Sequence, residues 1–96
     1  MSPKNKKKLD IIRKKLDQID NQLLAIIKKR TLLVNEVIKL KENKSEIVDQ
    51  KRITSILKNI KIKSIKKNID PKITNRIWKN MIWSYINYER KNFKKK

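Results

Sequence analysis

The sequence predicts an all-α protein of three helices, one long and two shorter, that pairs with a second copy of itself. The 96 residues include no glycine and only two prolines, Pro3 and Pro71, so hairpins and βα units lack the turn residues that they need. Apolar side chains instead recur at steps of three and four, the spacing of one helical face. A chain this short forms one domain, 1–96, with a limited core unless a partner covers it.

The first helix is expected over about 6–42. Its apolar residues follow alternating steps of three and four for about thirty residues, which corresponds to a helix of roughly 50 Å. We call this row the apolar seam; its members are Leu9, Ile12, Leu16, Ile19, Leu23, Ile26, Leu33, Val37 and Leu40. A helix of this length cannot fold back on itself, so the seam predicts a partner helix from a second chain.

The two shorter helices are expected over about 49–66 and 71–93, and a polar loop, ENKSEIV (42–48), precedes the first of them. Asp49 and Asp70 stand where helix N-caps are expected, and Pro71 suits a first helical position. The expected buried residues are Ile53, Ile56, Leu57 and Ile60, then Ile73, Ile77, Trp78, Met81, Ile82, Tyr85 and Ile86. We expect the second helix to fray in the lysine-rich stretch KIKSIKKN (61–68).

Composition excludes several classes of function. With no cysteine and no histidine, the chain has no disulfide, no thiolate site, and neither the usual general base nor the usual transition-metal ligand. We therefore expect no metal site and no cofactor. No apolar run approaches the ~18 residues of a membrane span, and no apolar region follows the basic start MSPKNKKK. A soluble cytoplasmic protein without a membrane partner is expected.

The net charge of +19 would ordinarily indicate a polyanionic partner. However, Lys, Asn and Ile, which have A/T-rich codons, supply 50 of the 96 residues. We attribute much of the charge to this bias and do not expect nucleic acid to be the partner, although a non-enzymatic basic helical binding protein remains an alternative. Only five of the 28 basic residues are arginine, and an arginine retained among so many lysines indicates a need for a planar, bidentate donor.

Arg30 occupies the position in the apolar seam where the next apolar residue should stand. A buried, unpaired guanidinium costs several kcal/mol, so Arg30 must meet an anion or reach solvent. One interpretation is structural: Arg30 pairs with Glu89 or extends to the rim of the seam. The other is functional: Arg13, Arg30, Lys41 and Arg52 line a pocket for a small polyanion.

Distances along the helix restrict the functional interpretation. Along a straight helix Arg13 lies ~25 Å from Arg30, whereas Lys41 lies only ~16 Å beyond Arg30, a gap that two long side chains and a small ligand can close. A metabolite-sized ligand therefore cannot touch Arg13 and Arg30 of one chain. If these cations serve one site, Arg13 comes from a second, antiparallel subunit, and the homodimer has two equivalent sites.

These residues resemble the all-helical chorismate mutases over about residues 9–90. The stretch IRKKLDQIDNQLLAIIKKRTLLVNEVIKLK (12–41) is similar to the family's first helix, with its site residues at Arg13, Arg30 and Lys41. DQKR (49–52) is similar to the start of the second helix, and IDPKITNRIWKNMIWSYINYE (69–89) to the third, with Glu89 at a site position. The resemblance implies an intertwined homodimer in which Arg13 of one subunit completes the partner's site.

Two positions depart from the mutase pattern. Ile53 replaces a glutamate that accepts a hydrogen bond from the ring hydroxyl of the substrate, and Tyr85 replaces a small residue. Both are similar to the related isochorismate-pyruvate lyases, which share the fold. The resemblance thus implies chorismate mutase activity, with isochorismate-pyruvate lyase activity, which forms salicylate, as the alternative.

The resemblance also implies roles for the site residues. Either reaction is a pericyclic rearrangement of a dicarboxylate and needs no nucleophile, metal or cofactor. Arg30 and the partner's Arg13 would hold the two carboxylates, while Lys41 and Glu89 would face the ether oxygen that becomes negative. Asp49 and Arg52 would orient the ring end or order the loop, and for Asp49 a plain helix cap is an equal alternative. Ile53 and Tyr85 would complete the substrate-binding set.

Overall fold

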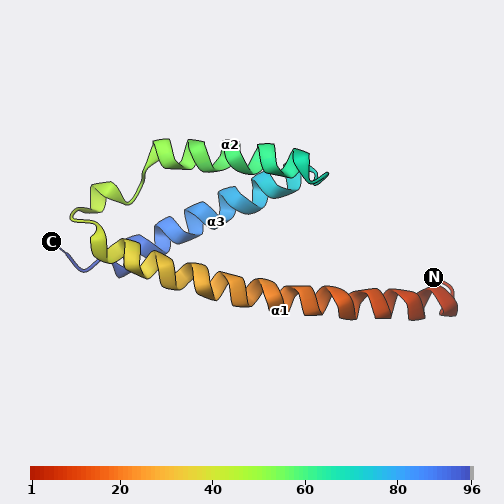
Figure 1. The fold of residues 1–96 in the computed structure, drawn as a ribbon. Coiled ribbons are helices and arrows are strands. Elements are labelled where there is room, and N and C mark those ends of the chain that lie inside the picture. Colours follow the sequence, from red (N-terminus) through yellow and green to blue (C-terminus); the bar gives the residue numbers. More distant parts are fainter. Residues whose placement is uncertain (96) are drawn as a thin grey trace. The chain divides into compact units, whose positions relative to one another are not determined.

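The computed structural model describes residues 1–95; Lys96 lies outside the described residues. It contains three α-helices, α1 (Pro3–Leu40), α2 (Gln50–Lys66) and α3 (Pro71–Asn92), and a short 3-10 helix, η1 (Lys44–Glu46) (Figure 1). No strand occurs among residues 1–95. The predicted all-α class is therefore confirmed, with one long and two shorter helices.

Helix α1 begins and ends earlier than the expected 6–42. At its start the Ser2 hydroxyl accepts a hydrogen bond from the backbone N–H of Asn5 at 3.2 Å, and Pro3 supplies a φ angle that suits a first helical residue. At its end the helix stops at Leu40. Lys41 therefore lies in the following loop rather than in the helix, which matters for the site described below.

The chain divides into two compact units, Met1–Leu33 and residues 34–96. The first unit is a single helix, the N-terminal part of α1, and most of its apolar residues are exposed in the single chain. Leu23 is 49% exposed and Leu33 is 62% exposed. Because exposed apolar area is costly in water, this helix presents a surface suited to a partner.

The second unit contains the last residues of α1, the loop with η1, and helices α2 and α3. Its core is formed by aliphatic residues from these segments and one phenylalanine at the end of α3. The buried members are Ile38, Ile47, Ile82, Ile86 and Phe93, and the partly buried residues packed against them include Val34, Val48, Ile53, Ile56, Leu57 and Tyr88. This core joins the loop to the end of α1, to α2 and to α3.

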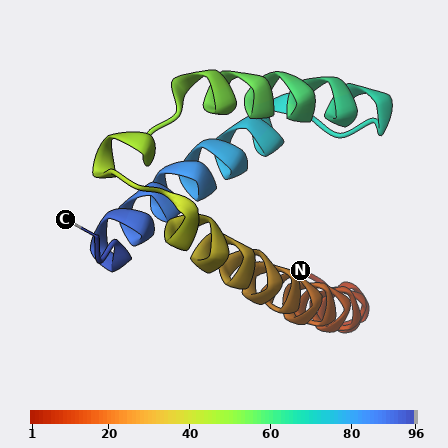
Figure 2. The same ribbon diagram turned by 60° about the vertical axis from the view of Figure 1, so that its left-hand side comes forward.

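A tight turn joins α2 to α3, and α3 runs back antiparallel beside α2, as Figures 1 and 2 both show. Asn68 in the turn has φ of 58°, a left-handed conformation that asparagine tolerates better than most residues. The Asp70 carboxylate then caps α3 by accepting a hydrogen bond from the backbone N–H of Lys72 at 2.9 Å. The predicted Asp70-Pro71 helix start is confirmed.

The expected fraying of α2 in KIKSIKKN is wrong, because the helix continues to Lys66. Ser64 is buried there, and its Oγ lies 2.7 Å from Thr74 Oγ1 on α3. The Ser64 hydroxyl also donates to the carbonyl of Ile60 at 2.6 Å. A hydrogen-bonded contact with α3 therefore stabilises this end of α2. The lysine-rich composition of the segment does not by itself predict a stable helix end.

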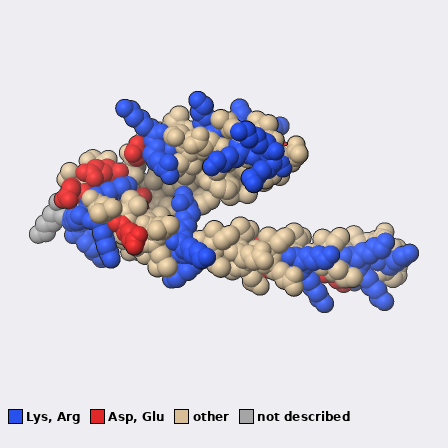
Figure 3. Space-filling model, in the orientation of Figure 1, with Lys and Arg blue, Asp and Glu red and all other residues tan. Residues whose placement is uncertain are grey.

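Lysine and arginine side chains cover much of the visible face of α2, whereas on α1 they lie toward the two ends with uncharged residues between them (Figure 3). Acidic side chains are visible in only a few places. None of the helices among residues 1–95 is both long enough and apolar enough to span a membrane.

Replacing Ile86 with alanine should lower the free energy of unfolding by about 2–5 kcal/mol, because it leaves a cavity in the core. Ile86 is only 4% exposed and contacts the core of the second unit. The matched control is Ile65→Ala on α2, where the side chain is 56% exposed and the expected change is within about 0.5 kcal/mol. Urea unfolding at one fixed protein concentration measures both. Equal effects would contradict the assignment of the core.

Candidate functional site

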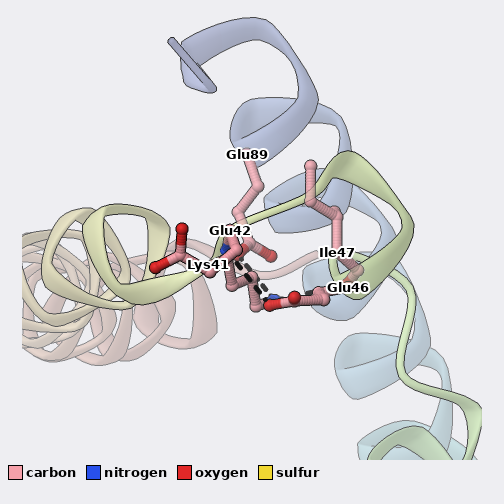
Figure 4. Close-up of polar contacts among 5 residues, drawn as sticks. All are labelled: Lys41, Glu42, Glu46, Ile47 and Glu89. Carbon is pink, nitrogen blue, oxygen red and sulfur yellow. Dashed lines mark hydrogen bonds and ion pairs between the residues drawn. The ribbon is translucent and has the colours of Figure 1, made fainter. Parts of the chain in front are cut away.

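Lys41 and Glu89 form an ion pair in which both side chains are largely buried. The Lys41 Nζ lies 3.1 Å from Glu89 Oε1, and the two side chains are 19% and 10% exposed. Figure 4 shows the two residues approaching from the loop after α1 and from α3. Both residues are predicted from the sequence to be site residues, and the structure brings these two together.

The loop after α1 positions the Lys41 ammonium. Ile47 is buried in the core of the second unit, and its carbonyl accepts a hydrogen bond from Lys41 Nζ at 3.5 Å. The loop curls back because the Glu46 carboxylate accepts a hydrogen bond from the backbone N–H of Glu42 at 3.2 Å (Figure 4). A buried aliphatic anchor and a local hydrogen bond therefore hold the loop against α3.

The Glu89 side chain is positioned by α3, where it shares the inward face with Ile82 and Ile86. A carboxylate placed among aliphatic residues needs a partner, since burial of an isolated charge is strongly unfavourable. The structure pairs Glu89 with Lys41. The two charges compensate each other, and an anionic or oxygen-rich ligand can compete with Glu89 for the ammonium group.

Asp49 and Arg52 lie together at the start of α2. The Asp49 carboxylate accepts a hydrogen bond from the backbone N–H of Arg52 at 3.0 Å, as an N-cap does. The capping interpretation of Asp49 is therefore confirmed. Both side chains are exposed, and a role for either of them in contact with a ligand stays a prediction.

Ile53 and Tyr85 are half-buried residues of α2 and α3. Ile53 packs against the core of the second unit. The Tyr85 ring meets the Tyr88 ring edge to face, with centroids 6.3 Å apart and planes at 83°. Ile53 can offer no hydrogen bond through its side chain, whereas Tyr85 brings both a ring and a hydroxyl.

Arg13 and Arg30 lie on α1 in the first unit, where Arg13 is exposed and Arg30 is half-buried. The other six site residues belong to the second unit. Convergence of the two arginines with Lys41 and Glu89 therefore stays a prediction. Among residues 1–95, no group of three or more His, Cys, Asp or Glu side chains is arranged to hold a metal ion.

A hydrogen bond near the site joins two residues, Asn35 and Tyr88, that the sequence does not predict to be site residues. The Tyr88 hydroxyl donates a hydrogen bond to Asn35 Oδ1 at 2.6 Å, which joins α3 to the end of α1. A polar residue on one helix gives no sign of its partner 53 positions away. One indirect indication that Tyr88 lies close to the site is present in the sequence, because Tyr88 directly precedes Glu89.

Residues 12–90 match the family model described as chorismate mutase type II. The match covers most of the chain and includes all eight site residues that the sequence predicts. No curated protein matches the chain, and no solved structure does.

Proposed function

The chain belongs to the chorismate mutase type II family, and we propose that it is a chorismate mutase that rearranges chorismate to prephenate in aromatic amino-acid biosynthesis. The observation that carries this proposal is the Lys41–Glu89 pair, formed by two residues at positions where the resemblance implies site residues. The reaction breaks a carbon–oxygen bond and forms a carbon–carbon bond within one molecule. It requires no nucleophile, metal or cofactor, so a site of cations and hydrogen-bond donors is sufficient.

Lys41 and Glu89 act at the ether oxygen in this proposal. That oxygen gains negative charge as its bond to the ring breaks, so a fixed ammonium group binds the transition state more tightly than the ground state. Glu89 assists as a hydrogen-bond donor when it is protonated and repels the oxygen when it is ionised. The largely buried setting of the pair strengthens both interactions, because little water screens them.

Arg30 and the partner's Arg13 hold the two carboxylates of the substrate. Guanidinium groups suit this task because their planar donors match a carboxylate bidentately. The clamp keeps the two reacting ends of the substrate close, which lowers the entropic part of the barrier. Asp49 orders the start of α2, and Arg52 beside it supplies further positive charge toward the ring end. Ile53 and Tyr85 line the substrate.

The exposed apolar seam of α1 supports an intertwined homodimer with shared sites. We propose that this homodimer acts in the cytoplasm. Sedimentation at micromolar protein concentration should show two chains, because a single chain leaves Leu23 and Leu33 about half exposed or more. A Leu23→Glu variant should weaken the dimer, whereas Lys51→Glu on the exposed side of α2 should not. A folded, active monomer would contradict the shared-site proposal.

A second candidate, isochorismate-pyruvate lyase, is favoured by Ile53 and Tyr85. The half-buried Ile53 side chain offers no acceptor for a ring hydroxyl. Isochorismate carries that hydroxyl on a different carbon. A site without this acceptor therefore loses less binding free energy with isochorismate than with chorismate.

Incubating the purified protein separately with chorismate and isochorismate distinguishes the two candidates. Prephenate from chorismate supports the mutase, and salicylate with pyruvate from isochorismate supports the lyase; mass spectrometry identifies each product. Turnover of neither compound, together with tight duplex binding at physiological salt, would favour a non-enzymatic basic binding protein. Such binding would weaken steeply as salt rises.

A further inference from the structure

Two polar contacts join α3 to the end of α1 and the following loop, both within the second unit. The Tyr88 hydroxyl donates to Asn35 Oδ1 at 2.6 Å, and Lys41 Nζ lies 3.1 Å from Glu89 Oε1. The two α3 residues are adjacent in sequence, whereas their partners are six residues apart. The Tyr88 hydroxyl donates to Asn35, whereas Lys41 donates to Glu89, so we assign the hydroxyl no direct part in the proposed chemistry.

The hydroxyl of Tyr88 makes a polar contact outside α3, and two further contacts of this residue lie within α3. Besides the hydroxyl contact, its ring packs edge to face on Tyr85 at 6.3 Å, and its backbone carbonyl accepts a hydrogen bond from Asn92 Nδ2 at 2.8 Å. The Asn35 contact is partly buried, so water competes poorly for it. A side chain held in this way can transmit its position to its neighbours on the helix.

We propose that the Asn35–Tyr88 hydrogen bond fixes the rotation of α3 about its own axis. It thereby holds the Glu89 carboxylate beside the Lys41 ammonium and keeps the Tyr85 ring in its orientation. Adjacent helical residues point about 100° apart. The aliphatic core contacts of Ile82 and Ile86 have no directional preference, whereas two polar contacts in different directions restrict the rotation of α3. Loss of the hydrogen bond from Tyr88 lets α3 roll by a small angle, and the Lys41–Glu89 distance then varies.

The kinetic consequence rests on the proposed function. A donor and a cation that act on the transition state must be placed before the reaction begins, so looser placement lowers kcat more than it raises KM. We expect Tyr88→Phe to lower kcat about tenfold, which corresponds to about 1.4 kcal/mol. The phenylalanine ring keeps the packing on Tyr85, so the fold should persist.

The first test does not depend on any activity. The coupling between Lys41 and Glu89 is measured by a double-mutant cycle with Lys41→Met and Glu89→Gln, using urea unfolding at one protein concentration. The cycle is then repeated in the Tyr88→Phe background, where the coupling should fall to half or less. An unchanged coupling would overturn the proposal.

Thr74→Val is the matched control. It removes another short hydrogen bond between helices, Ser64 to Thr74 at 2.7 Å, at the opposite end of α3 from Glu89. It should lower stability yet leave the Lys41–Glu89 coupling and kcat unchanged. If Thr74→Val reduces the coupling as much as Tyr88→Phe does, general loosening of the fold explains the result and the proposal fails.

Asn35→Asp is the conservative variant, because its carboxylate still accepts from the Tyr88 hydroxyl, whereas Asn35→Leu does not accept. Asn35→Asp should keep kcat within about twofold of wild type, and Asn35→Leu should match the tenfold loss of Tyr88→Phe. The double variant Asn35→Leu/Tyr88→Phe should lose no more than either single variant. An equal loss of kcat in Asn35→Asp and Asn35→Leu would overturn the proposal. So would losses of kcat that add up in the double variant. Absence of wild-type turnover on either substrate would instead refute the proposed function, and the coupling measurement would still decide this inference.

Discussion

An equal mixture of the Arg13→Ala and Arg30→Ala variants should recover activity that neither variant has alone. Each single change removes one carboxylate contact from every site, with an expected loss of roughly 10²–10³ in turnover. If each site takes Arg30 from one chain and Arg13 from its partner, a mixed dimer contains one intact site and one site lacking both arginines. After complete subunit exchange about one quarter of all sites are intact, and turnover should approach that fraction of the wild-type value.

The control for this experiment is a mixture of Arg30→Ala with Lys41→Ala. Arg30 and Lys41 are proposed to serve the same site from the same chain, so no mixed dimer contains an intact site, and no activity should return. Mass spectrometry of differently tagged chains verifies the exchange. Recovery in the control, or none in the Arg13→Ala and Arg30→Ala mixture, would show that the sites are not shared in the proposed way.

Replacing Lys41 with methionine should lower turnover by roughly 10²–10³, since it removes the cation that stabilises the developing negative charge. It should also destabilise the fold, because Glu89 then lies largely buried without its partner. The double variant Lys41→Met/Glu89→Gln should recover stability without recovering activity. Urea unfolding and turnover measured on the same preparations separate the two effects. Recovered activity in the double variant would exclude a catalytic role for Lys41.

Replacing Glu89 with glutamine should preserve much of the activity. Glutamine has nearly the same shape, still accepts from Lys41 and supplies a permanent donor toward the ether oxygen. Turnover of the folded variant, measured beside that of the wild type, checks this expectation. A folded but inactive Glu89→Gln variant would show that the carboxylate itself is required.

Several features of the molecule follow from local signals in the sequence. Asp49 and Asp70 cap α2 and α3 because a short carboxylate before a helical run satisfies free backbone N–H groups. The steps of three and four predicted a long helix, which the structure contains as α1. The candidate site residues followed from the resemblance and from the arginine in the seam, and residues 12–90 do match the family. Each of these predictions depends either on a few neighbouring residues or on a pattern that the family shares.

Contacts between segments distant in sequence depend on how the helices pack and could not be predicted from local residues. Nothing near Ser64 indicates that Thr74 stabilises a lysine-rich helix end, and nothing near Asn35 indicates that its partner is the hydroxyl of Tyr88. The pairing of Glu89 with Lys41 likewise depended on α1 ending at Leu40, which leaves Lys41 in a loop that Ile47 anchors in the core. Local sequence determines where helices begin and which face is apolar, whereas the partner of a buried polar group depends on how the helices pack.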